Sequence, residues 1–248
     1  MSAPTVNVDT RTHTVIKISW SQVPRADQYR IQYVDTPTYK KIVDSGREKT
    51  FRMRYLLSED QNIRVRNLDP YTEYLFFVRA ERGQQIGENG TITDYTRLSP
   101  TQAIEIKSRT DKTSQLSWAS VSGAIGYTIK YQAQEPVQNE ELSLYVEKTK
   151  ETLKNLLPGS SYKLVIIAEA PETSGQPAND EFDTFLEAPE EIITSVYDTY
   201  TKTICWKPVF MAEGYTMNYG SIEQEDKTSR AKDFTDFVEG GETCGHLD

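Results

Sequence analysis

Four arginines in the first third of the chain have the chemistry and spacing of an anion-binding surface. They alternate with apolar residues in the stretches 51–55 and 63–66, and they are Arg52, Arg54, Arg64 and Arg66. Because alternate side chains of a strand share a face, we expect these guanidinium groups on the outer face of neighbouring strands. Guanidinium groups bind sulfates, phosphates and carboxylates through paired hydrogen bonds. The favoured interpretation is that the arginines solubilise an exposed face and pair with Glu48, Glu59 and Asp60; the alternative is a site for a sulfated polysaccharide.

Two cysteines and one glycosylation sequence are the other chemically distinctive features. Asn89 begins the only Asn-x-Ser/Thr sequence, which is used only if the chain enters the secretory route. Cys205 and Cys244 could form a disulfide bond. Because Cys244 lies close to the C-terminal end, we expect two free thiols instead.

Catalytic groups are sparse. The two histidines, His13 and His246, belong to no nucleophile–base–orienter pattern, and the chain has no Gly-rich phosphate loop and no His-Glu-x-x-His sequence. Two cysteines and two histidines are also too few for a disulfide framework or a Cys/His metal cluster. We therefore expect no enzymatic activity, no metal site and no cofactor.

Composition narrows the class of protein further. The 248 residues carry a formal net charge of −9, and 37% of them are hydrophobic, which is enough for a packed core. An acidic chain is a poor general binder of nucleic acid. No apolar run approaches the roughly 18 residues of a membrane span, so we expect no membrane insertion by this segment. The charge is uneven: residues 1–98 hold 15 basic and 12 acidic side chains, whereas residues 189–248 hold 5 and 12.

A repeated pattern of aromatic residues divides the chain into three units. In each unit a tryptophan closes an alternating stretch, and nine residues later a tyrosine opens a second one. The pairs are Trp20 and Tyr29, Trp118 and Tyr127, and Trp206 and Tyr215. Alternation with period two, rich in Val, Ile, Tyr and Thr, is typical of half-buried antiparallel strands, and no stretch has a comparably strong helical pattern. Prolines near each junction place the units at 1–98, 99–188 and 189–248.

A second shared sequence, Leu-x-Pro-x-x-x-Tyr, occurs in the first two units. It spans Leu68 to Tyr74 and Leu156 to Tyr162, and each tyrosine begins another alternating run. A tyrosine in this place can bury its ring while its hydroxyl binds the turn backbone, which fixes the crossover between two sheets.

Together these features resemble the fibronectin type III repeat over nearly the whole chain. The resemblance implies an all-β fold of tandem immunoglobulin-like (fibronectin type III) antiparallel β-sandwiches, with seven strands in a complete repeat. It also implies that five aromatic residues belong to the structural core rather than to a functional site: Trp20, Tyr74, Trp118, Tyr162 and Trp206.

The third unit departs from this pattern. The corner tyrosine follows the tryptophan by 54 and 44 residues in the first two units, which puts the third one at 250 or 260, beyond Asp248. We therefore expect region 189–248 to be a partial repeat that lacks its last two strands and exposes a strand edge. We expect the chain to be a fragment of a longer protein. Its tail from about Gly220 onward should be poorly ordered or pack differently from the family.

For function, the resemblance implies a non-catalytic segment of a larger extracellular or cell-surface adhesion, receptor or matrix protein. Such a segment would serve as a spacer and a protein-binding surface. Short proline-containing linkers predict a semi-rigid rod. The alternative is a cytoplasmic scaffold of the muscle-filament type, which fits the scarce cysteines, and a ligand-sensing receptor segment is a third class.

Overall fold

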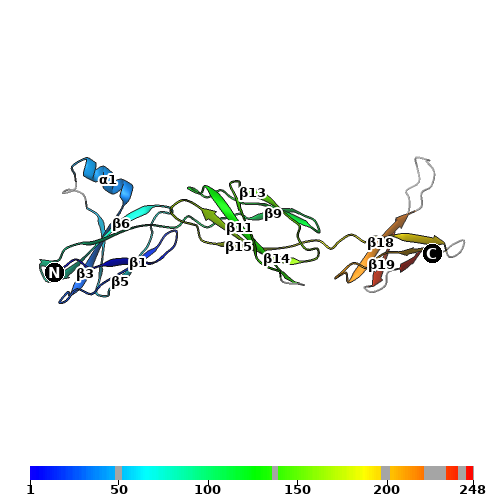
Figure 1. The fold of residues 1–248 in the computed structure, drawn as a ribbon, viewed down its shortest axis with the longest axis horizontal. Coiled ribbons are helices and arrows are strands. Elements are labelled where there is room, and N and C mark those ends of the chain that lie inside the picture. Colours follow the sequence, from blue (N-terminus) through cyan, green and yellow to red (C-terminus); the bar gives the residue numbers. More distant parts are fainter. Residues whose placement is uncertain (48–51, 136–138, 197–201, 221–232, 240–243, 248) are drawn as a thin grey trace.

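The computed structural model describes residues 1–47, 52–135, 139–196, 202–220, 233–239 and 244–247. Its strands form three groups that follow one another along the long axis, with the two termini at opposite ends (Figure 1). All strand pairs are antiparallel. The expected all-β fold of tandem sandwiches is confirmed.

The first unit consists of two antiparallel sheets packed face to face. One sheet has the order β1-β2-β5, with the bounds Val6–Arg11, Ile16–Trp20 and Asn62–Val65. The other has the order β4-β3-β6, and β7 and β8 both pair with β6. Its bounds are Arg54–Ser58, Gln28–Asp35, Glu73–Arg82, Gln85–Ile86 and Gly90–Tyr95.

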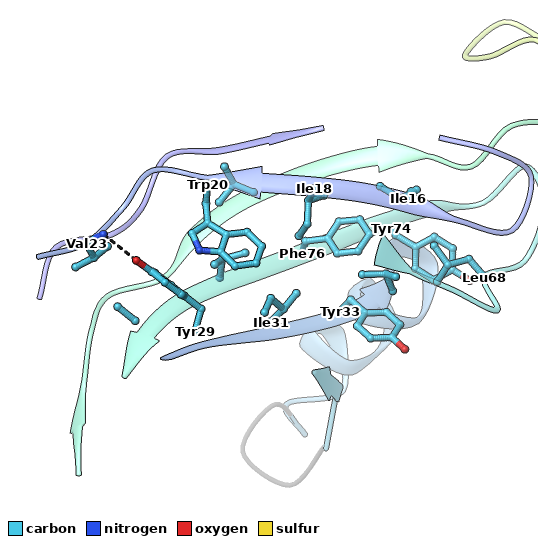
Figure 2. Close-up of a cluster of buried hydrophobic side chains, with 14 residues drawn as sticks. Ile16, Ile18, Trp20, Val23, Tyr29, Ile31, Tyr33, Leu68, Tyr74 and Phe76 are labelled. Atoms are coloured by element: carbon cyan, nitrogen blue, oxygen red, sulfur yellow. Dashed lines mark hydrogen bonds between the residues drawn. The ribbon is translucent and has the colours of Figure 1, made fainter. Parts of the chain in front are cut away.

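Alternation along the strands produces the core of this unit. In β2 the residues Ile16, Ile18 and Trp20 are buried while the residues between them are partly exposed. These side chains meet Ile31 and Phe76 from the facing sheet, and the hydroxyl of Tyr29 accepts a hydrogen bond from the backbone N–H of Val23 (Figure 2). Complete burial of an Ile or Phe side chain contributes roughly 1.5–3 kcal/mol.

A short helix, α1 (Thr36–Asp44), separates β3 from β4 and was not expected from the sequence. Its N-cap is Asp35, whose carboxylate accepts a hydrogen bond of 2.8 Å from the backbone N–H of Thr38. Pro37 in the first turn has the φ that a helix needs at this place. The helix occupies part of the extra length that distinguishes the first unit from the second.

The second unit repeats this arrangement. The sheet β13-β10-β9 has the bounds Lys150–Lys154, Thr113–Ser117 and Glu105–Arg109. The sheet β12-β11-β14-β15 has the bounds Leu142–Val146, Gly126–Glu135, Ser161–Glu169 and Ala178–Asp183. Leu116 of the first sheet and Ile129, Leu164 and Ile166 of the second are fully buried between them.

The structure places all five expected core aromatics in buried positions. Trp20, Tyr74, Trp118, Tyr162 and Trp206 are between 1% and 9% exposed. The two corner tyrosines have the same role in both units. The hydroxyl of Tyr74 accepts a hydrogen bond of 3.0 Å from Asp69 N–H, and that of Tyr162 accepts one of 2.8 Å from Leu157 N–H.

The third unit has two smaller sheets. One has the order β16-β17-β20, with the bounds Ile193–Val196, Lys202–Cys205 and Cys244–Leu247; the other pairs β18 (Gly214–Gly220) with β19 (Asp233–Glu239). Part of the tail, residues 221–232, lies outside the described residues. The expectation that the tail packs differently is wrong for β19 and β20, because they pair with β18 and β17 as β4 and β5 pair with β3 and β2.

The two cysteines form a disulfide bond, which corrects the expectation of two free thiols. Cys205 and Cys244 lie directly opposite each other in the β17–β20 pair. Their pairing depends on strand register, which the sequence does not reveal for a strand as short as β20.

Candidate protein-binding surface

The four sequence-predicted arginines lie on two different sheets. Arg54 begins β4 and Arg52 precedes it, whereas Arg64 lies in β5 and Arg66 follows that strand. Because β4 and β5 belong to opposite sheets, the arginines form two separate pairs. No ion pair between described residues involves any of the four.

Arg52 and Arg54 border a polar cavity of about 250 Å³ at the end of β3. Its other polar walls include Asp35, Asp69 and the corner Tyr74. Burial raises the pKa of the Tyr74 hydroxyl. A cavity lined by two arginines and two aspartates suits a ligand that has both an acidic and a basic group better than a purely anionic one.

A more ordered surface lies on the outer face of β3, β4 and β6. Arg30 and Leu57 are paired residues, as are Gln32 and Tyr55, so these side chains share one face. Tyr55 is 55% exposed and Leu57 is 48% exposed. We call Arg30, Tyr55, Leu57, Phe77 and Glu81 the outer patch.

Glu81 holds the Arg30 side chain of the outer patch in place. It is only 6% exposed, and it accepts hydrogen bonds from Arg30 Nε at 2.7 Å and Arg79 Nε at 3.3 Å. The hydrogen bond from Arg30 lowers the pKa of the Glu81 carboxyl and raises that of Arg30. The Arg30 guanidinium in turn stacks 4.6 Å from the centre of the Tyr55 ring, which holds an exposed aromatic side chain in place.

Helix α1 borders the outer patch. The ring of Tyr39 in α1 lies 5.8 Å from the ring of Phe77 in β6, so the helix packs against this face of the sheet. Sequence reasoning missed the outer patch because Arg30 and Tyr55 are joined only by strand pairing. Alternation in 51–55 was misleading, because it predicted outward arginines, whereas the register pairs Arg54 with the buried Tyr33 and turns Tyr55 outward.

The first two units are joined by a packed junction. The Tyr71 hydroxyl donates a hydrogen bond of 2.5 Å to Glu172, and His13 Nδ1 lies 2.7 Å from the side-chain oxygen of Gln176. The ring of Tyr71 fits over Gly123, where a Cβ would lie only 2.2 Å from the ring. The hydrogen bond to Glu172, followed by burial, raises the pKa of Tyr71 to about 12. These residues hold the two units in one orientation.

Asn89, the predicted glycosylation residue, is exposed in the turn that precedes β8. The next residue, Gly90, packs so closely on the chain start that a Cβ would lie 1.9 Å from the Pro4 carbonyl oxygen. The turn is therefore tied to the body of the unit while the Asn89 side chain is accessible.

The described residues hold no cluster of three or more His, Cys, Asp or Glu side chains that could bind a metal ion. No helix among them has the length and apolar character needed to cross a membrane.

Comparisons with known proteins agree with the fold. Residues 2–94 match the model of the fibronectin type III domain. Tenascin-N of Mus musculus is 25% identical over 222 residues, and the match covers 88% of this chain and 14% of the relative. The collagen alpha-1(XII) chain of Oryctolagus cuniculus is 24% identical over 226 residues, covering 89% of this chain and 34% of the relative. The chain thus spans a minor part of both relatives.

A solved structure of a two-domain fibronectin type III segment from chicken tenascin is also similar. It is 22% identical, has a TM-score of 0.42, and covers 73% of this chain and 99% of its own. Tenascins and collagen XII are extracellular matrix proteins. The family match over residues 2–94 covers the first unit and supports a fibronectin type III repeat family, whose tryptophan and corner-tyrosine pattern recurs in the second unit.

Proposed function

We propose that this chain is a non-catalytic spacer and protein-binding segment of an extracellular matrix or adhesion protein, with units at 1–98, 99–188 and 189–248. The outer patch is the observation that carries the binding role. An exposed tyrosine side chain beside an ordered arginine is typical of the residues that dominate binding energy at protein interfaces. The packed junction supports the spacer role, because it fixes the direction of the second unit relative to the first.

The Cys205–Cys244 disulfide supports an oxidising compartment over the cytoplasmic scaffold alternative. The test is the native protein treated with an N-glycan-removing enzyme. We expect a size shift that is lost in Asn89→Gln, and no alkylation of either cysteine before reduction. A protein that does not shift, and whose cysteines react freely, would support the cytoplasmic scaffold.

The binding role is tested by cell attachment to a surface coated with the whole chain. We expect Tyr55→Ala and Arg30→Ala to reduce attachment at least threefold, since both change the outer patch. The matched control is Tyr145→Ala in the second unit, a residue that is also exposed, at 52%. Equal attachment to all variants would exclude the outer patch as the binding surface.

A sulfated polysaccharide is a second candidate partner, supported by the unpaired arginines of the first unit. Because the arginines form two pairs, the variants Arg52→Ala/Arg54→Ala and Arg64→Ala/Arg66→Ala test each pair separately. Salt-sensitive retention on a heparin column, lost in one double variant and kept in the other, would locate the site. Retention unchanged in both would leave the arginines as solubilising residues.

A further inference from the structure

Strand β12 of the second unit has one edge with no strand beside it among the residues that the structure describes. It lies at the end of the sheet β12-β11-β14-β15, where it pairs with β11. With the facing sheet, the described part of the second unit has the seven strands of a complete repeat. The open edge of β12 therefore belongs to a finished sandwich.

The sequence of β12 does not protect this edge. Proteins commonly protect edge strands with charged residues or proline. The other strands at sheet ends in this unit, β9, β13 and β15, each contain three charged residues. By contrast, β12 reads Leu-Ser-Leu-Tyr-Val, with neither charge nor proline. This composition is typical of a strand that has neighbours on both sides.

The inward side chains of β12 are all apolar and are only partly covered. They are Leu142, Leu144 and Val146. Leu142 is 45% exposed, and the other two are partly buried at the margin of the core. Leu142 lies opposite Tyr131, whereas the equivalent Tyr33 of the first unit lies opposite Arg54. An inward charge is one of the devices that protect edge strands, and β12 lacks it.

The largest outward side chain of β12 leaves the edge accessible. The ring of Tyr145 lies back over β11, where a Cβ on Gly126 would be only 2.1 Å from the Tyr145 hydroxyl oxygen. The strand that follows, β13, is at the end of the facing sheet. The backbone of β12 and its partly covered inward side chains are thus open on the same side of the sandwich.

A carboxylate lies at each end of β12. Glu141 precedes the strand and Glu147 follows it, and alternation places both on the outward face with Ser143. Glu141 accepts a hydrogen bond of 2.9 Å from Lys130, and Glu147 is exposed. If β12 paired in full with β12 of a second copy, Glu141 would lie opposite Glu147 at both ends, and like charges destabilise a strand pair. The charges favour instead a segment with basic residues at these two places.

We propose that the open edge of β12 binds an extended peptide segment of a partner protein by strand addition, and that this segment has alternating apolar residues and a basic residue at each end. Its backbone completes the hydrogen bonds of the edge. Its apolar side chains cover the inward side chains of β12, and its basic residues face Glu141 and Glu147. The site lies on the second unit and is independent of the outer patch.

The test uses the whole chain and the labelled peptide Lys-Ile-Thr-Val-Thr-Ile-Lys, with blocked termini, in fluorescence anisotropy. The peptide matches the positions from Glu141 to Glu147, and we expect saturable binding. Leu142→Arg gives β12 the inward charge that β4 has in the first unit. It should weaken binding at least about tenfold, with an unchanged circular dichroism spectrum. Ser143→Arg adds the same charge on the outward face and should weaken binding no more than about threefold.

A charge exchange tests the preference for basic ends. Replacing both lysines of the peptide with glutamate should weaken its binding to the wild-type chain at least about threefold. The variant Glu147→Lys should bind this acidic peptide more tightly than the wild type does, because one repulsion becomes an attraction. Equal binding of the basic and acidic peptides to the wild type would contradict the proposal.

Backbone methylation separates strand addition from unspecific adhesion. Methylating the nitrogens of the threonines, or those of the apolar residues, removes donors on opposite sides of the peptide strand, so one peptide should lose binding and the other keep it. Tyr55→Ala, in the outer patch, should leave peptide binding unchanged. No saturable binding, or equal binding to the wild type and Leu142→Arg, would overturn the proposal. Dimers that Leu142→Arg abolishes and the peptide does not dissociate would show that a second copy occupies the edge, also against the proposal.

Discussion

The second and third units have equivalent strands around their tryptophans but are stabilised by different means. In the second unit the inward side chains of β14 and the corner Tyr162 form one continuous core with Trp118. In the third, the buried apolar side chains among the described residues are Trp206 and Val238, and a disulfide joins β17 to β20. The comparison teaches that a covalent link between strands can take over part of the role of apolar burial when burial is small.

The strongest test of this difference removes the disulfide. Cys205→Ser/Cys244→Ser should destabilise the third unit by about 4 kcal/mol, because the bond closes a loop with a sequence separation of 39 and restricts the unfolded chain. Hydrogen exchange with mass spectrometry should show faster exchange in β16–β20 and unchanged exchange in β9–β15. Unchanged exchange in the third unit would mean that its packing suffices without the bond.

Truncating an apolar side chain should instead destabilise the second unit more than the third. Leu164→Ala removes a fully buried side chain from the closed core and should destabilise the second unit by about 3 kcal/mol. Met217→Ala, beside an apolar groove of about 510 Å³, should destabilise the third unit by less than about 1 kcal/mol, because water already reaches that space. Local exchange rates in increasing urea measure both, and equal losses would contradict an open groove.

The sequence predicts the features that are local in both units. The alternating stretches around Trp118 and Trp206 specify strands, and the offset to Tyr215 specifies the next strand, because pleating and spacing are properties of a short segment. The Cys205–Cys244 bond depends on strand register between distant segments, and Arg30 meets Tyr55 in the same way, so neither is visible in a single sequence.

Helix α1 was not predicted from the sequence, for a different reason. Its nine residues are too short for a clear helical period, and none of its side chains is buried. The N-cap Asp35 and the proline two residues later were the available signals.

Removing one tyrosine hydroxyl from the second unit and one from the third tests the same difference with a smaller expected loss of stability. Tyr162→Phe leaves the backbone N–H of Leu157 without its 2.8 Å partner next to a buried ring and should destabilise the second unit by about 1 kcal/mol. Tyr215→Phe removes the equivalent bond to Val209 N–H in the third unit. There the groove admits water, which can replace the hydroxyl, so we expect about half that effect. Urea unfolding followed by local hydrogen exchange distinguishes the two, and an equal loss would indicate that the third unit excludes water as the second does.

The smallest expected effect concerns the packed junction between the first and second units. By contrast, an exposed linker joins the second unit to the third. The pKa of Tyr71 is about 12 at the junction, against 10.0 in the absence of Glu172 and burial. Because the docked state binds the Tyr71 proton more tightly, its contribution is complete below pH 10 and decreases as the pH rises from 10.0 to about 12. Since the pair is open to solvent, we expect a change of only about 0.5 kcal/mol.

An ultraviolet titration of tyrosinate in the wild type and in Glu172→Gln measures this contribution. The variant should shift the late-titrating tyrosine toward 10.0, since the charge that raises its pKa is gone. Gly123→Ala provides a steric control, because its Cβ would displace the Tyr71 ring and should lower the pKa of Tyr71 without removing any charge. If Glu172→Gln lowers the pKa of Tyr71 and Gly123→Ala does not, the Tyr71 hydroxyl binds Glu172 even when its ring does not fit closely over Gly123. The junction would then be held by one hydrogen bond rather than by packing, and the contrast with the exposed linker would be much smaller.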